Sequence, residues 1–140
     1  MAYWLIKSEP NVFSWDDLVA KGKTGEMWDG VRNHSAKLNL MAMKTGDKAF
    51  FYHSNIGKEI VGVAEVIKES YPDPTADAGS PWVVVDFGAV EPFKTPVGLA
   101  DVKQDPVLSE MALIKLSRLS VQPVTVAEWK HVCKLGGVKP

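Results

Sequence analysis

One stretch decides the fold: Gly46–Asp73, GDKAFFYHSNIGKEIVGVAEVIKESYPD. Residues 48–54 are aromatic or otherwise suited to a strand, and residues 60–68 return to β-branched character. Between them, Asn55 and Gly57 are the residue types that a tight turn requires. The stretch therefore predicts a β-hairpin.

The two faces of this hairpin carry different side chains. Alternation along the first strand separates two sets, Phe50, Tyr52 and Ser54 on one face from Phe51 and His53 on the other. On the return strand, Gly62 and Ala64 share a face and leave it almost bare, which lets another element or a flat ligand approach the backbone. We therefore expect a pocket near the hairpin.

The composition predicts one domain over residues 1–140. A chain of this length buries roughly two thirds of its unfolded surface, which is enough for a core without disulfides. The 16 Lys and Arg residues against 17 Asp and Glu leave a net charge of -1, so no global field attracts the protein to nucleic acid or membranes. Any nucleic-acid site must be local.

The sequence also bears on the compartment. Cys133 is the only cysteine, which excludes an internal disulfide, and Lys7 and Glu9 lie where a signal peptide would be apolar. We expect an intracellular protein, cytoplasmic, or nuclear in a eukaryote. No stretch approaches the length of a membrane span, so no membrane association is expected, and we expect a monomer.

Three helices and two helical turns are predicted from residues typical of helix caps and from the residues that end helices. The helices are expected at residues 14–22, 35–43 and 125–136, and the turns at 98–104 and 106–113. Capping boxes begin the first and the last helix. The middle helix is expected to be capped by Asn33 or His34 and to turn Leu38 and Met41 inward, with Leu40 as a further candidate for that face.

Further strands are predicted at residues 3–7, 82–90 and 118–123. Pro92 and Pro96 are expected to end the second of them, and Tyr71–Thr75 to form a rigid loop because two prolines restrict it. Trp28 is expected in a loop, either folded back onto the core or serving as a stacking wall. The chain lacks regular strand and helix alternation. We therefore predict an α+β fold, a small curled sheet or barrel surrounded by short helices.

Templates for enzymes and metal sites are missing from the sequence. It has no Gly-rich phosphate loop, G-x-S-x-G elbow, C-x-x-C or H-E-x-x-H, so we expect no catalytic residues, no cofactor and no metal. Glu128 and His131 resemble half of a di-iron motif whose second half is absent. Cys133 is expected in the core. A structural role for His53 is favoured over a ligand contact.

The remaining chemistry-bearing residues match the needs of a base-binding pocket. Such a pocket requires flat surfaces for the base, fixed donors and acceptors for its edge, and cations for the phosphates. The candidates in that order are Trp28, Tyr52 and Tyr71; Ser8, Asn33, Ser54, Asp73 and Ser120; and Lys7, Arg32 and Arg118. The alternative interpretation is that the aromatic residues form the core and the polar residues form caps and turns.

The same residues carry a resemblance to the EVE domain family. The similar segments are YWLIKSEP (3–10), FSWDDL (13–18), WDGVRN (28–33), GDKAFFYHSN (46–55), IVGVAEV (60–66), YPDPTA (71–76) and RLSVQPVT (118–125). Together they span nearly the whole chain. His34 and Ser35 depart from the pattern, because the family is expected to have an aromatic residue or glutamine followed by alanine there.

The resemblance implies a PUA-like fold, similar to YTH domains, and a non-enzymatic module that recognises a modified cytosine in DNA. It implies a pocket at Ser8, Trp28, Asn33, Tyr52, His53, Ser54, Tyr71, Asp73, Arg118 and Ser120. Within it we assign Trp28 and Tyr52 to stacking, Asn33, Ser54 and Asp73 to the base edge, and Arg118, Lys7 and Arg32 to phosphate. Two alternatives stay open: a reader of modified RNA bases, and an enzyme that acts on a nucleotide or small heterocycle with His53 as acid or base.

Overall fold

The computed structural model describes residues 1–140 and contains one six-stranded mixed sheet with the strand order β2-β5-β4-β3-β1-β6. The strands are β1 (Tyr3–Ser8), β2 (Glu26–Met27), β3 (Lys48–His53), β4 (Glu59–Pro72), β5 (Val83–Gly98) and β6 (Val121–Val124). The helices are α1 (Trp15–Ala20), α2 (His34–Ala42), α3 (Leu99–Gln104), α4 (Ala112–Lys115) and α5 (Val126–Gly136). No helix is long and apolar enough to cross a membrane.

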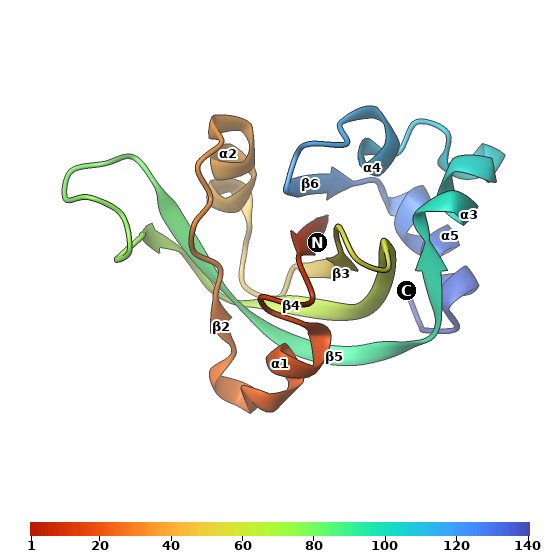
Figure 1. Ribbon diagram of the computed structural model, residues 1–140, viewed down its shortest axis with the longest axis horizontal. Coiled ribbons are helices and arrows are strands. Elements are labelled where there is room, and N and C mark those ends of the chain that lie inside the picture. Colours follow the sequence, from red (N-terminus) through yellow and green to blue (C-terminus); the bar gives the residue numbers. More distant parts are fainter.

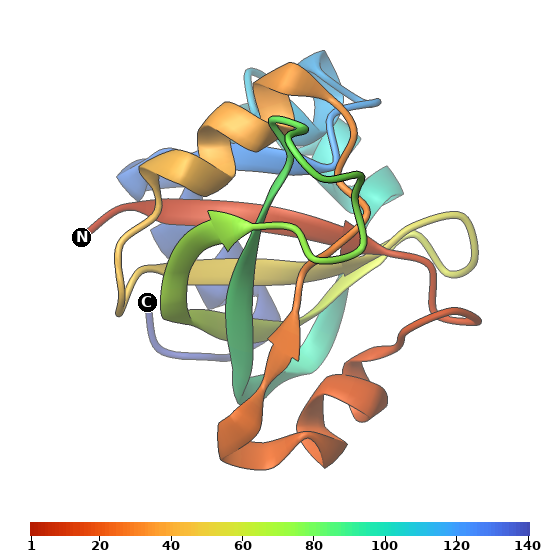
Figure 2. The same ribbon diagram turned by 90° about the vertical axis from the view of Figure 1, so that its left-hand side faces the viewer.

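The predicted hairpin forms the centre of the sheet. Strands β3 and β4 pair antiparallel, and the turn between them contains Asn55 and Lys58 at positive φ. Strand β1 lies parallel to β3 on the other side, while the remaining strand pairs are antiparallel. The sheet curls so strongly that β5 runs across β1 and β3 (Figures 1 and 2). The α+β expectation of a small curled sheet with short helices around it is confirmed.

Two hydrophobic clusters lie on opposite faces of this sheet. Phe51 belongs to the cluster beside α1 and α2, whereas Phe50 and Tyr52 belong to the cluster beside α5. In the second cluster Trp129 of α5 stacks on Phe50 with ring centroids 3.9 Å apart. The alternation of side chains predicted along the first strand of the hairpin therefore matches their division between the two hydrophobic clusters.

The bare patch on β4 is filled by the protein itself. A Cβ atom at Gly62 would lie 2.6 Å from the indole ring of Trp15, which packs flat against this stretch of backbone. Trp15 also contacts Phe51 edge to face at 5.5 Å. The close approach that the glycine predicts is thus made by the first residue of α1, and no ligand site lies there.

Caps agree with the sequence at three helix starts. Ser14 with Asp17 and Thr125 with Glu128 form capping boxes at α1 and α5. The side chain of Asn33 caps α2 by accepting a hydrogen bond from the backbone N–H of Ala36. These contacts fix where each helix begins.

Three strand predictions are wrong in length. Pro92 and Pro96 do not end β5, because the pairing with β4 shifts register between Pro92, the partner of Gly62, and Val97, the partner of Ile60, and irregularities of this kind tolerate proline. Tyr71 is part of β4 and pairs with Val84, so the loop begins only at Asp73. The last strand is also shorter than predicted, since residues 118–120 precede β6 as an irregular loop.

The inward face predicted for α2 is wrong for Leu38 and Met41 and correct for Leu40. Leu38 and Met41 are 60% and 51% exposed, and the helix packs through Ala36 and Leu40. The side-chain amide of Asn39 donates to the carbonyl of Val121 at 2.7 Å, which turns the helix toward β6.

Candidate nucleic-acid interface

The first cavity, called here the Trp28 cavity, opens between the end of β1, the turn that follows it and β2. It encloses about 240 Å³ and is lined by Lys7, Ser8, Glu9, Val12, Phe13, Glu26, Met27, Trp28 and Asp29. The hydroxyl of Ser8 donates to the carbonyl of Phe13, which ties the turn back onto β1. Three of the predicted site residues, Lys7, Ser8 and Trp28, thus lie together here.

Trp28 is a fixed wall of this cavity. Its ring meets Phe13, Phe51 and Phe87 edge to face, with centroid distances of 6.1, 5.7 and 5.6 Å. Its backbone N–H donates to the carbonyl of Val85 at 2.9 Å, and only 9% of the residue is exposed. The interpretation that Trp28 packs on the core is confirmed, and the same side chain also lines the cavity.

The charges in the Trp28 cavity are mostly negative. Glu9, Glu26 and Asp29 contribute carboxylates, whereas Lys7 is the only cation in the lining. The ammonium of Lys7 donates to the carbonyl of Ser117 at 2.6 Å, and burial lowers its pKa. Carboxylates accept hydrogen bonds, so the cavity suits a ligand edge that donates them.

A second cavity, called here the Arg118 cavity, lies where the loop before β6 faces the start of α2. It encloses about 410 Å³ and is lined by Asn33, Ser35, Lys115, Leu116, Ser117, Arg118 and Leu119. Two of the lining residues are cations and none is an acid. The predicted residues Asn33 and Arg118 therefore lie in a different cavity from Trp28.

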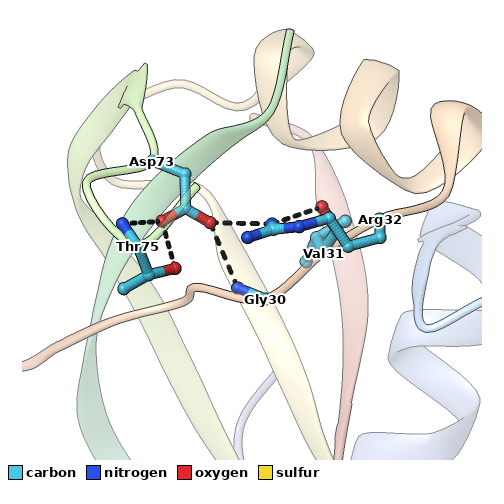
Figure 3. A network of polar contacts seen from close by, with 5 residues as sticks. All are labelled: Gly30, Val31, Arg32, Asp73 and Thr75. Atoms are coloured by element: carbon cyan, nitrogen blue, oxygen red, sulfur yellow. Dashed lines mark hydrogen bonds and ion pairs between the residues drawn. The ribbon is translucent and has the colours of Figure 1, made fainter. Parts of the chain in front are cut away.

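The segment between the two cavities is held by Asp73, which is only 6% exposed (Figure 3). One carboxylate oxygen accepts from the backbone N–H of Gly30 at 3.2 Å and from the guanidinium of Arg32 at 2.9 Å. The other accepts from the N–H and the hydroxyl of Thr75 at 2.7 and 2.6 Å. Burial raises the pKa of Asp73, but the hydrogen bonds from Thr75, Arg32 and Gly30 outweigh it and bring the pKa to about 2.

Asp73 and Arg32 are therefore already paired with each other. The carboxylate uses both oxygens within the protein, so neither is left unpaired for the base edge. One guanidinium nitrogen of Arg32 is bound to it, while 40% of the Arg32 side chain is exposed. The guanidinium of Arg32 also lies 5.8 Å from the ring of Trp82. Their common role is to hold the chain from Gly30 to Arg32 in place.

Three other predicted residues make contacts within the protein. Tyr52 is buried on the opposite face of the sheet from Trp28, so the two rings do not form one stacking pocket. His53 accepts a hydrogen bond from the backbone N–H of Trp15 at 3.1 Å, and burial lowers its pKa. Tyr71 donates to Asp86 at 2.6 Å, and burial, followed by this bond, raises its pKa to about 12.

The last two predicted residues act through their backbones. Ser54 donates its N–H to the carbonyl of Ser8 at 2.9 Å, and Ser120 accepts from the N–H of Lys7 at 3.0 Å. Each of them extends the pairing around β1 and so lies beside a cavity without lining it.

Several lining residues were missed by the sequence reasoning. Glu9 and Phe13 lie in segments that carry the family resemblance, so their position next to Ser8 was a usable signal. Glu26 and Met27 form a two-residue strand with no periodicity to detect, and they enter the site only because β2 pairs with Phe87 and Asp86 of β5.

The residues considered for metal or nucleophilic chemistry have other partners. Glu128 closes the capping box of α5, and the ring of His131 lies 2.6 Å from a carboxylate oxygen of Asp105. Cys133 is fully buried, and burial raises the pKa of its thiol to about 11.

Comparison with known proteins gives consistent matches along the chain. A family model for the EVE domain matches residues 2–135. An NMR structure of a protein from Rhodopseudomonas palustris is 66% identical with a TM-score of 0.93, covering 98% of this chain and 94% of its own. An X-ray structure from Agrobacterium tumefaciens is 52% identical with a TM-score of 0.97, covering 99% and 94%.

A human relative is also similar over the whole chain. Thymocyte nuclear protein 1 is 36% identical over 170 residues, which cover 99% of this chain and 76% of the human protein. A crystal structure of the human protein in complex with 5-methylcytosine-containing DNA is 36% identical, with a TM-score of 0.88 and full coverage of both chains.

Proposed function

The chain belongs to the EVE domain family, and from this membership we propose that it binds DNA and recognises a modified cytosine in the Trp28 cavity. The observation that carries the proposal is the crystal structure of the human relative in complex with 5-methylcytosine-containing DNA, whose fold matches this chain with a TM-score of 0.88. The Trp28 cavity supplies an aromatic wall with hydrogen-bonding groups around it.

The size of the Trp28 cavity supports a single base as its ligand. Pockets for drug-sized molecules enclose about 300–1,000 Å³, whereas this cavity encloses about 240 Å³. A base in duplex DNA lies inside the stack, so the protein must act on a single strand or on an extruded base. One flat ring against Trp28 would gain about 1–3 kcal/mol from stacking.

The carboxylates support cytosine over thymine. Cytosine presents an amino group at N4, to which Glu and Asp side chains bond, whereas thymine presents the O4 acceptor at the same place. Glu9, Glu26 and Asp29 line the cavity. Their carboxylates can accept a hydrogen bond from the amino group of cytosine, but they cannot form one with the O4 acceptor of thymine. Thymine carries the same 5-methyl group as 5-methylcytosine, which makes the two bases a matched pair of ligands.

Burial of the methyl group alone supports only a modest preference. One buried methyl contributes about 0.8 kcal/mol, or roughly a four-fold preference over unmodified cytosine. Val12, Phe13 and Met27 provide apolar lining that such a methyl group could contact. A larger preference would require a polar modification that gains a hydrogen bond to a charged partner, worth about 1.5–3 kcal/mol.

The test is binding of labelled single-stranded DNA that differs only at one central base: cytosine, 5-methylcytosine, 5-hydroxymethylcytosine or thymine. Fluorescence anisotropy should give the order modified cytosine, cytosine, thymine. Val12 is 73% exposed and borders the cavity, so Val12→Trp should obstruct it without disturbing the core. Val19 on α1 is 50% exposed and lines neither cavity, so Val19→Trp is the matched control.

The results separate the proposal from its rivals. Modification-dependent binding that Val12→Trp abolishes and Val19→Trp retains would support the base site. Equal affinity for all four strands would contradict base recognition in the Trp28 cavity. Stronger binding to RNA of the same sequence would instead identify a reader of modified RNA.

A further inference from the structure

We propose that the Arg118 cavity binds a phosphate of the DNA backbone beside the base held in the Trp28 cavity. This assignment rests on the proposed function and adds a second contact region to it. Phosphate contacts from Arg, Lys and hydroxyl groups set the register of a protein on nucleic acid, while base contacts supply the specificity. The two cavities are suited to these two tasks in different ways.

The difference lies in their charge. The Trp28 cavity is lined by three acidic residues and by Lys7, whose ammonium group donates to the carbonyl of Ser117. The Arg118 cavity is lined by an arginine and a lysine and by no acidic residue. Arg118 is exposed and takes part in no ion pair or side-chain hydrogen bond within the protein. Lys115 has one partner, Glu110 at 3.7 Å, and both side chains are largely exposed. An anion is therefore favoured in the second cavity and disfavoured in the first.

The loop that carries Arg118 is held in place by hydrogen bonds to its backbone carbonyls. Gln122 is fully buried, and its amide donates to the carbonyls of Leu116 and Leu119 at 3.0 and 2.9 Å. The ammonium of Lys7 holds the carbonyl of Ser117. Three carbonyls of the five-residue loop 116–120 are thus fixed before any ligand arrives, which reduces the entropy lost on binding.

The two cavities are also close in the fold. Lys7 lines the Trp28 cavity, while its ammonium group reaches a lining residue of the Arg118 cavity. The chain from Trp28 to Asn33 borders the first cavity at one end and the second at the other. In Figures 1 and 2 the path that leads into α2 rises past β5 toward the loop before β6. One strand of DNA can therefore contact both cavities with neighbouring groups.

The test measures DNA affinity as a function of salt for the unaltered protein, Arg118→Gln and Lys115→Gln. Lys130 is exposed on α5, lines neither cavity, and gives the matched control Lys130→Gln. The probes are labelled strands with central cytosine or 5-methylcytosine. The 5-methylcytosine strand is prepared either with natural phosphodiesters or with neutral methylphosphonates on both sides of that base. Melting temperatures show whether each variant is folded.

We expect Arg118→Gln to lower affinity about tenfold at low salt, by the same factor for cytosine and 5-methylcytosine strands. The plot of log affinity against log salt should become less steep by about 0.7, the value for one phosphate contact on a single strand. Lys115→Gln should act in the same direction and Lys130→Gln should have no effect. On the methylphosphonate strand, Arg118→Gln should cause no further loss.

Two outcomes would overturn this assignment alone. One is an Arg118→Gln variant with unchanged affinity and salt dependence. The other is a loss that persists on the methylphosphonate strand or changes the ratio between cytosine and 5-methylcytosine, which would place Arg118 at the base. Failure of the unaltered protein to bind any strand would overturn the proposed function and this phosphate site together.

Discussion

Replacement of Asp73 by asparagine should destabilise the protein and loosen the segment between the two cavities. Each carboxylate oxygen of Asp73 accepts two hydrogen bonds, one from Gly30 and Arg32 and the other from Thr75. Asparagine has one acceptor oxygen and one amino group. If the amino group faces Gly30 and Arg32, both of their bonds are lost. If it faces Thr75, the bond from the backbone N–H is lost, whereas the hydroxyl can turn and accept from the amino group.

The size of the effect follows from the number and kind of these bonds. The loss of one or two hydrogen bonds to the charged carboxylate amounts to about 2–4 kcal/mol of the free energy of unfolding. The same bonds lower the pKa from 3.8 to about 2, which corresponds to about 2 kcal/mol. Since folding lowers this pKa, the stabilisation is complete above about pH 4 and is lost as the pH falls from 4 toward 2.

Urea denaturation at pH 7 measures the loss of stability, and the same experiment at pH 2.5 measures its pH dependence. The Asp73→Asn variant should unfold at about 1–2 M less urea than the parent at pH 7, and the gap should narrow at pH 2.5. Asp77 is exposed in the same turn, so Asp77→Asn is the matched control and should match the parent. An Asp73→Asn variant as stable as the parent at pH 7 would refute the reasoning.

Three further predictions concern groups outside this network. Gly62→Ala should lower stability by about 1–3 kcal/mol, measured by thermal melting, because its Cβ would lie 2.6 Å from the ring of Trp15; an unchanged melting temperature would contradict this packing. Because folding lowers the pKa of His53, stability should be complete above about pH 6.5 and decline below it. Loss of that decline in His53→Gln would confirm the assignment, and its retention would reject it. The thiol of Cys133 should react with a disulfide reagent at pH 8 only after urea is added, since it is buried and its pKa is about 11.

Local chemistry in the sequence was sufficient to predict much of the fold. The hairpin, the capping boxes at Ser14 and Thr125 and the burial of Trp129 follow from rules that act over a few residues. The path of β5 through Pro92 and Pro96 does not, because the tolerance for proline there depends on a register shift against a distant strand. Propensity rules describe one strand at a time and contain no information on that pairing.

The same limit explains what was missed at the site. Alternation along β3 correctly separates Tyr52 from Phe51, but it does not say which face carries Trp28, because Trp28 arrives from another part of the chain. Asp73 was assigned to the base edge as a short polar residue beside two prolines. The structure places it against Arg32, a residue 41 positions away, and only that pairing shows that its oxygens are already used.

The pairing of Asp73 with Arg32 also limits how the proposed interface can gain affinity. Arg32 is paired with the buried carboxylate of Asp73, and Lys7 donates to a backbone carbonyl. Among the residues that line the two cavities, Lys115 and Arg118 are the cations with neither kind of partner. Two phosphate contacts on a single strand give a salt dependence of only about −1.4. Non-specific attraction to DNA is therefore weak in a chain with a net charge of -1. Under the proposed function, the affinity must come mainly from the base against Trp28, so discrimination between bases and affinity for the strand are lost together when that cavity is blocked.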